Sequence, residues 1–216
     1  MTITIREPGS AITHFIGMVF ATIASIPLLI KAALTAGTSG LIAMTVFMTS
    51  MVLLYTASTL YHSVNLQGKA LKRFRKLDHM MIFVLIAGSY TPICMLVLNP
   101  VSGHRLLVVI WLLALVGMLI NLLWITCPKW FSSIIYIAMG WACVSVFGQL
   151  FSALSASGFF WLLTGGIIYT IGGIIYALKL PVFNSLHKNF GSHEIFHLFV
   201  MGGSICHYIC MYTCIL

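Results

Sequence analysis

Residues 39–63, SGLIAMTVFMTSMVLLYTASTLYHS, form a predominantly apolar stretch without aspartate, glutamate, lysine or arginine. A helix crosses the hydrocarbon layer of a bilayer with about 20 such residues, so this stretch is long enough to span a membrane. The same criterion predicts seven spans in all, at about 11–31, 39–63, 77–98, 104–126, 130–152, 158–178 and 193–214. We therefore expect an all-α membrane protein, a seven-transmembrane helix bundle that forms a single domain over residues 1–216.

The composition of the whole chain supports this expectation. Of its 216 residues, 61% are hydrophobic and only 6% are charged, and the mean hydropathy is +1.08. A soluble domain carries about 25% charged residues, so the composition excludes a soluble globular protein. The first apolar stretch, residues 11–30, is longer than the apolar core of a cleavable signal, which has about 7–15 residues. We expect it to remain as the first span.

Proline and glycine mark two further features of the predicted bundle. Thr126-Cys127-Pro128-Lys129 separates the fourth span from the fifth, because proline ends a helix. The sixth span carries the pairs Gly165-Gly166 and Gly172-Gly173 seven residues apart, a pattern that allows a neighbouring helix to approach closely.

The lysines and arginines predict the orientation of the bundle. Two basic residues, Lys31 and Arg105, lie in connectors on the side opposite the N-terminus. The other nine lie on the side of the N-terminus: Arg6, Lys69, Lys72, Arg73, Arg75, Lys76, Lys129, Lys179 and Lys188. Because cytoplasmic loops carry the excess of basic residues, we expect a cytosolic N-terminus and an external C-terminus in a plasma (inner) membrane.

A basic cluster stands out in the predicted connector between the second and third spans. Anionic lipid headgroups attract such clusters, so membrane lipids are the expected partners. The sequence contains no nucleic-acid motif, and it does not predict an oligomeric state. The residues of the cluster are Lys69, Lys72, Arg73, Arg75 and Lys76.

Five polar residues lie near the cytosolic ends of three predicted spans: Ser58 and His62, Asp78, and His193 and His197. An ionisable side chain in mid-membrane costs about 2.5–3.5 kcal/mol on insertion scales, which makes each one a candidate for function. Residues four apart share one helix face with about 6 Å of rise between them. We therefore expect all five to converge at one depth.

Three imidazoles with an open coordination position are typical of a catalytic zinc site, in which bound water has a pKa of about 7. We expect His62, His193 and His197 to bind Zn²⁺, Asp78 to accept a proton or orient the water, and Ser58 to hydrogen-bond the substrate oxygen. A lone histidine is more often a hydrogen-bonded packing residue. The agreement in depth favours the metal site over that alternative.

The sequence predicts no direct role in metal binding for Glu194 or for three other histidines. His193-Glu194-Ile195-Phe196-His197 matches H-E-x-x-H, in which glutamate is the base of a zinc protease. Glu194 lies about 100° around the helix from His193, near the surface, so we expect it to be solvated. His14 has the correct depth to support a ligand, and His79 is expected to point away. His207 lies about 21 Å along the helix from His193, too far to bind the same ion.

The chain resembles the hemolysin III family, the bacterial branch of the progestin and adipoQ receptor (PAQR) membrane proteins. The resemblance implies seven helices with a cytosolic N-terminus, and zinc bound by His62, His193 and His197. The related alkaline ceramidases share a serine and an aspartate as well, which match Ser58 and Asp78. The matching segments are Glu7-Pro8 with Ile12-Thr13-His14, Ser58-Thr59-Leu60-Tyr61-His62, Lys76-Leu77-Asp78-His79, and Gly191 to Val200 leading to His207-Tyr208.

The expected functions fall into different classes. The first is a zinc-dependent hydrolase that acts on a lipid amide or ester at the inner leaflet. The second is a non-catalytic sensor or regulator of membrane lipid homeostasis, in which zinc is structural. A cytolysin (hemolysin) and an intramembrane metalloprotease are further alternatives. A pore-forming cytolysin needs a water-soluble form or an amphipathic insertion segment, and neither is evident in the sequence.

Overall fold

The structure, a computed structural model, describes residues 5–124, 128–178 and 190–216. Across these ranges nearly all residues are helical and no strand is formed. Seven helical segments are long and apolar enough to cross a membrane, which confirms the all-α seven-span bundle. The elements are α1 (Pro8–Thr35), α2 (Gly37–Ser63), α3 (Gly68–Pro92) with a π turn (Ile93–Val97), α4 (Pro100–Leu123), α5 (Lys129–Gly140), a 3₁₀ segment (Trp141–Val146), α6 (Phe147–Ala153), α7 (Ala156–Leu178) and α9 (Ser192–Cys210) with a π turn (Met211–Ile215).

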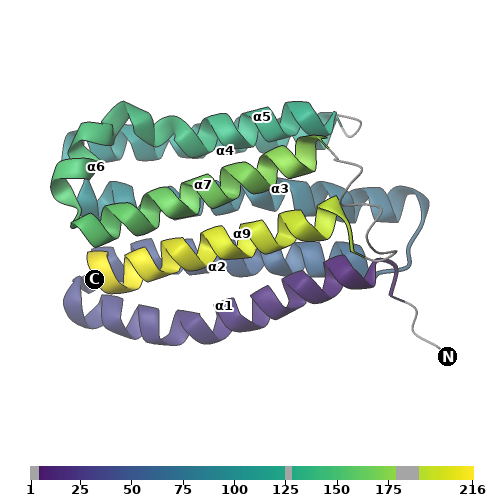
Figure 1. Ribbon diagram of the computed structural model, residues 1–216, viewed down its shortest axis with the longest axis horizontal. Coiled ribbons are helices and arrows are strands. Elements are labelled where there is room, and N and C mark those ends of the chain that lie inside the picture. Colours follow the sequence, from purple (N-terminus) through teal and green to yellow (C-terminus); the bar gives the residue numbers. More distant parts are fainter. Residues whose placement is uncertain (1–4, 125–127, 179–189) are drawn as a thin grey trace.

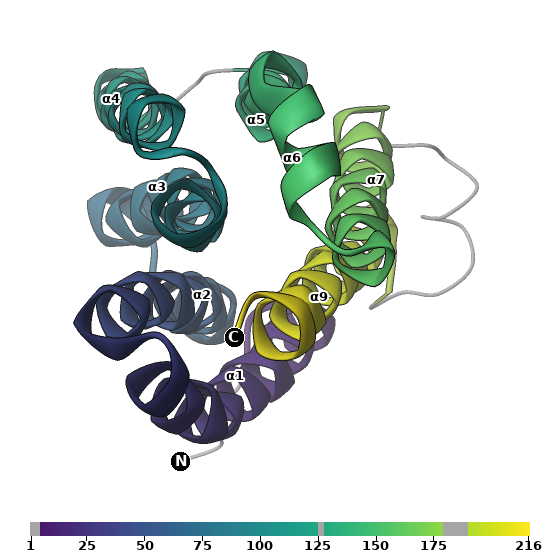
Figure 2. The ribbon, with the colours of Figure 1, turned by 90° about the vertical axis from the view of Figure 1, so that its left-hand side faces the viewer.

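The spanning helices run along one long axis, and the two ends of the chain lie at opposite ends of the bundle (Figure 1). Seen along that axis, α1 to α4 follow one another in an arc, and α5, α6 and α7 continue it on the other side (Figure 2). α9 packs between α7 and the pair α1–α2. Which end faces the cytosol stays a prediction, and two of the basic residues behind it, Lys179 and Lys188, lie outside the described ranges.

The third helix begins at Gly68, nine residues before the expected start, so the basic cluster is helical and the connector is only residues 64–67. The hydropathy criterion detects only the part of a helix that matches the hydrocarbon layer. Lysine, arginine, alanine and leucine are good helix formers, so the helix continues beyond that layer. Lys76 donates a hydrogen bond to the carbonyl of Leu122 near the end of α4. This bond ties α3 to the end of α4.

The fifth span is broken in the middle, where one continuous helix over 130–152 was expected. Backbone groups released by such a break need new partners inside a membrane. Tyr90 provides them: its hydroxyl donates to the Gly140 carbonyl at 2.5 Å and accepts from the Cys143 N–H at 3.0 Å. The fourth span ends at Leu123, and its expected end at residue 126 lies outside the described residues.

One glycine of each pair in the sixth span, Gly165 and Gly172, lies against α9, and their spacing of seven allows this close approach. A Cβ atom at Gly172 would lie 2.6 Å from the Cβ of Phe199, and one at Gly165 would lie 2.4 Å from the His207 ring. Real Cβ atoms do not approach this closely, so a larger side chain at either position would push α7 and α9 apart. This packing holds the middle and the end of α9 against α7.

A Gly172→Ala substitution is therefore expected to lower the thermal stability of the bundle. The added methyl group meets a Cβ that is fixed to the α9 backbone, and such overpacking costs about 1–3 kcal/mol. Gly166→Ala is the matched control on the same helix, because nothing lies within 4 Å of the added atom and alanine favours helix. Thermal unfolding of both variants in one detergent is the measurement. Equal midpoints for the two would contradict the packing argument.

Candidate metal centre

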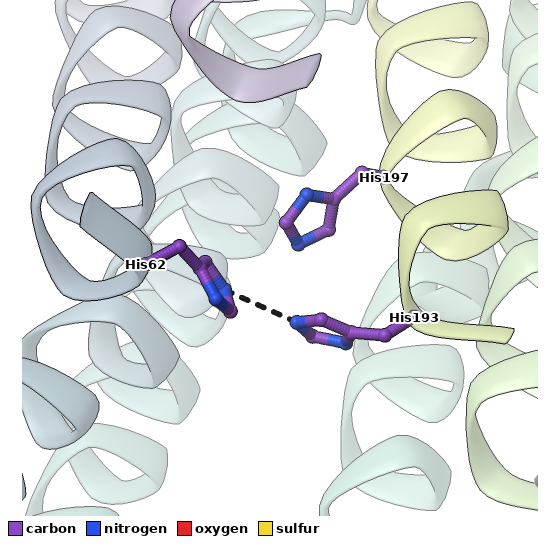
Figure 3. A group of neighbouring side chains, drawn as sticks. All are labelled: His62, His193 and His197. Atoms are coloured by element: carbon purple, nitrogen blue, oxygen red, sulfur yellow. Dashed lines mark hydrogen bonds between the residues drawn. The ribbon is translucent and has the colours of Figure 1, made fainter. Parts of the chain in front are cut away.

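Three histidine side chains meet at the end of the bundle where α1 begins. His62 comes from the last turn of α2, and His193 and His197 come from the first two turns of α9. Each offers one ring nitrogen, and the three nitrogens lie within 4.8 Å of one another. The Nε2 atoms of His62 and His193 are 3.1 Å apart, and the His197 ring lies beside them (Figure 3). Burial of His62 and His197 is almost complete, at 1% and 2% exposure.

The spacing of these nitrogens suits a divalent cation. Two imidazole nitrogens on a tetrahedral zinc ion, each about 2.0–2.1 Å from the metal, lie about 3.3 Å apart. The 3.1 Å between His62 and His193 is close to this value, and the third nitrogen lies within 4.8 Å of both. The three histidines are thus positioned to bind a metal ion.

Ser58 and Asp78 lie beside the same cavity as His193 and His197. Ser58 is fully buried, and its hydroxyl has no hydrogen-bond partner within the described part of the chain. Asp78 is 6% exposed, with a carboxylate oxygen 3.6 Å from Nδ1 of His79. The sequence therefore identified five residues that gather at one end of the bundle, although Asp78 lies outside the group of three close nitrogens.

The cavity has a volume of about 160 Å³ and extends from His193 and His197 along the inside of the bundle. On α9 its lining begins at His193 and ends at His207. His79 also lines it, against the expectation that this ring points away: the cavity is wide enough to reach both neighbours on α3. Most of the remaining wall is apolar and includes Ile82, Leu85, Phe147, Leu150, Phe159 and Val200.

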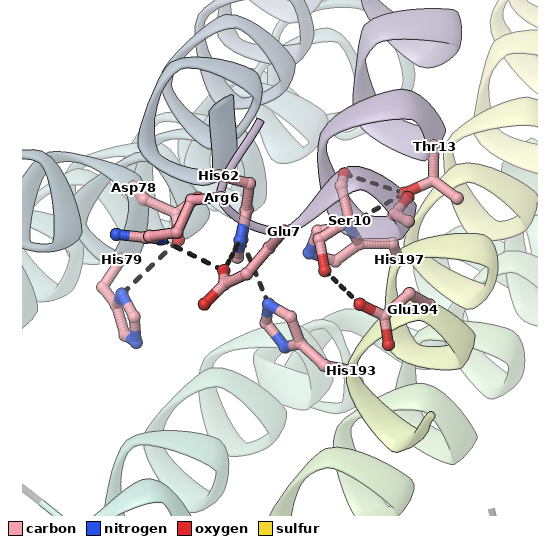
Figure 4. A network of polar contacts seen from close by, with 11 residues as sticks. Arg6, Glu7, Ser10, Thr13, His62, Asp78, His79, His193, Glu194 and His197 are labelled. Carbon is pink, nitrogen blue, oxygen red and sulfur yellow. Dashed lines mark hydrogen bonds and ion pairs between the residues drawn. The ribbon is translucent and has the colours of Figure 1, made fainter. Parts of the chain in front are cut away.

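Sequence reasoning missed the contribution of α1 to this site. The Glu7 carboxylate is hydrogen-bonded to Nδ1 of His62, and the Thr13 hydroxyl lies 3.1 Å from Nδ1 of His197 (Figure 4). His14 supports the site as expected, because its ring stacks on that of His197 with centroids 3.6 Å apart. Glu7 is one of only three acidic residues in the chain, a rarity that could have identified it.

Glu7 stays ionised in this position. The hydrogen bond with His62 is the main cause that lowers the pKa of its carboxyl group, partial burial opposes it, and Arg6 at 3.1 Å lowers the pKa further. A negative charge therefore lies directly behind the His62 ring, on the side away from His193.

Glu194 is not a solvated side chain, which corrects the expectation. Its carboxylate accepts the Gly191 N–H at 2.8 Å, which caps the start of α9, and it also accepts the Ser10 hydroxyl. The bond from Ser10 ties the first turn of α1 to the first turn of α9. Glu194 is half-buried and does not line the cavity, so the position gives no support to the role of a protease base.

Comparison with known proteins identifies relatives of the whole chain. Hemolysin-3 of Bacillus cereus is 38% identical over 206 residues, which cover 95% of this chain and 90% of that protein. The hemolysin-3 homolog of Bacillus subtilis (strain 168) is 37% identical over 96% of this chain and 94% of its own length. The adiponectin receptor protein of Drosophila melanogaster is 25% identical over 94% of this chain and 49% of the receptor. The profile of the family described as haemolysin-III related matches residues 3–208, and the chain belongs to this family of multi-pass membrane proteins.

Proposed function

We propose that the chain is a zinc-dependent hydrolase that cleaves an amide or ester bond of a membrane lipid reached from the inner leaflet. The observation that carries the proposal is the position of the histidine cluster at one end of a long apolar cavity, with a buried carboxylate and a buried hydroxyl beside it. The leaflet follows from the predicted orientation.

Each polar residue of the site has a distinct task in this reaction. His62, His193 and His197 would hold the zinc ion. A bound zinc ion supplies Lewis acidity, which polarises a carbonyl oxygen and makes water a better nucleophile at neutral pH. Asp78 takes up the proton of the attacking water. The Ser58 hydroxyl donates a hydrogen bond to the carbonyl oxygen as negative charge develops on it.

The shape of the cavity supports a lipid as the substrate. Its lining on α9 runs from His193 to His207, which corresponds to about 21 Å of helix. One leaflet contributes about half of the 30 Å hydrocarbon layer, so the cavity is long enough for an acyl chain. Its apolar wall would bury that chain, while the cluster of polar residues at the other end receives the amide or ester.

A sensor or regulator of membrane lipid homeostasis with structural zinc is the second candidate. The histidines come from two different helices, and this favours the second candidate. An ion bound to all three would join α2 to α9. The name of the Drosophila relative, an adiponectin receptor protein, also agrees with a role in signalling. The two Bacillus relatives are named hemolysins, and cell lysis is the third candidate.

Release of fatty acid from ceramides and phospholipids tests the enzyme against the sensor. Zinc-loaded wild-type protein in detergent is expected to release fatty acid from at least one of these lipids, and the His62→Ala variant is expected to release none above background. His104→Ala is the matched control, because His104 is exposed and does not line the cavity. Zinc-loaded wild-type protein that releases no more fatty acid than His62→Ala would favour the sensor for these lipids.

A further inference from the structure

We infer that α1 sets the tautomers of two zinc-binding histidines, with Thr13 acting on His197 and Glu7 acting on His62. The inference rests on the proposed metal centre. Thr13 lies in the second turn of α1 and Glu7 directly precedes the helix, and each contacts the Nδ1 side of a ring that would bind metal through Nε2. They are positioning residues that determine which nitrogen carries the hydrogen.

The geometry around Thr13 favours one arrangement of hydrogens. A threonine hydroxyl has a single hydrogen to donate, and here it lies 2.9 Å from the Ser10 carbonyl and 3.1 Å from the Gly9 carbonyl. Both carbonyls can only accept, and the Ser10 carbonyl is nearer to the hydroxyl than Nδ1 of His197, so we assign the hydrogen to the carbonyl. The hydroxyl therefore accepts from His197 at 3.1 Å, which places the hydrogen on Nδ1. Nε2 of His197 keeps its lone pair for a cation.

Glu7 acts on His62 in the same way. The Glu7 Oε2 atom that contacts Nδ1 of His62 also accepts from the Arg6 guanidinium at 3.1 Å, so it acts as an acceptor and Nδ1 of His62 carries the hydrogen. Nε2 of His62 is then the free lone pair, and it points toward Nε2 of His193 (Figure 3). The negative charge behind the ring also raises the basicity of the nitrogen that faces the metal.

Both contacts depend on the start of α1, which is anchored to α2 and to α9. The Glu7 N–H donates to the His62 carbonyl at 3.0 Å, and the Ser10 hydroxyl binds Glu194 at the start of α9. The first two turns of α1 thus place both acceptors before a metal arrives. Loss of such partners behind a ligating histidine typically weakens metal binding by about 10–100-fold.

Zinc affinity of the full-length protein in detergent, measured by competition with a chromogenic chelator, tests the inference. Thr13→Val keeps the size of the side chain but removes the acceptor, and we expect it to bind zinc about 10–100-fold more weakly. Thr13→Ser restores the hydroxyl and should bind within about threefold of wild type. Thr22→Val is the matched control, because the Thr22 hydroxyl also donates to its own helix, at 2.8 Å to Met18, at an exposed position.

The role of Glu7 is tested with Glu7→Gln and Glu7→Leu. The glutamine oxygen still accepts a hydrogen bond without the charge, whereas leucine cannot accept, so the loss of affinity should be larger for leucine. The thermal midpoint of the metal-free protein should be similar for wild type, Thr13→Val and Thr22→Val.

The outcomes separate this inference from the proposed function. Wild-type protein that binds no zinc would overturn both. Tight binding by wild type and by Thr13→Val alike would overturn only the tautomer inference. Thr13→Val that loses metal-free stability, and that Thr13→Ser does not rescue, would show a structural role and would also overturn the inference.

Discussion

Replacement of Asp78 by asparagine is expected to abolish lipid hydrolysis while zinc stays bound. Asparagine has nearly the same size as aspartate but cannot take up a proton, and loss of a general base reduces turnover by about 10²–10⁴-fold. Asp78 lies outside the group of three close nitrogens, so the zinc content should remain that of the wild type. Fatty-acid release and zinc content, measured on the same sample, check both parts of this expectation.

The control for Asp78→Asn comes from the same helix. Ser89 lines the same cavity on α3, and its hydroxyl donates to the Leu85 carbonyl at 2.8 Å, so Ser89→Ala should keep its turnover. Asp78→Asn protein with wild-type turnover would contradict the assigned role of the carboxylate. Loss of both zinc and turnover would instead make Asp78 part of the metal-binding group.

Replacement of His193 or His197 by alanine is expected to remove zinc from the protein. Each variant leaves only two of the three histidines, which is one protein ligand fewer than catalytic zinc sites use. After dialysis, zinc per chain should fall from about one to near zero. Zinc should also raise the thermal midpoint of the wild type and leave that of either variant unchanged.

His207→Ala is the control for these variants. His207 lies on the same helix and lines the same cavity, and its Nε2 atom lies 3.3 Å from the Leu162 carbonyl, far from the histidine cluster. This variant should retain its zinc. Zinc that persists in His193→Ala and His197→Ala but disappears in His207→Ala would contradict the assignment of the centre.

Hydropathy predicted the number of spans because a bilayer requires long apolar helices. Average hydropathy did not predict two local features, because these features have other physical causes. The start of α3 lies beyond the hydrocarbon layer, where helix propensity decides, and the break in the fifth span depends on Tyr90 from another helix. Neither feature leaves a signal in the average hydropathy of its own segment.

The histidines and Asp78 could be found from sequence because ionisable residues are rare in spans and because topology fixes their depth. The contacts of Glu7 and Thr13 with the histidines were missed. Glu7 precedes its span and contacts a histidine 55 residues away, and Thr13 contacts one 184 residues away. A threonine in an apolar helix also looks like an ordinary back-bonded hydroxyl, as Thr22 shows.

Metal analysis of the purified wild-type protein together with X-ray absorption at the zinc edge tests the central claim most directly. We expect one zinc ion per chain, with nitrogen and oxygen ligands at about 2.0–2.1 Å and the scattering pattern of three imidazoles. Folded protein that binds no zinc in zinc-replete medium would contradict it. Zinc held by sulfur ligands at about 2.3 Å would contradict it as well.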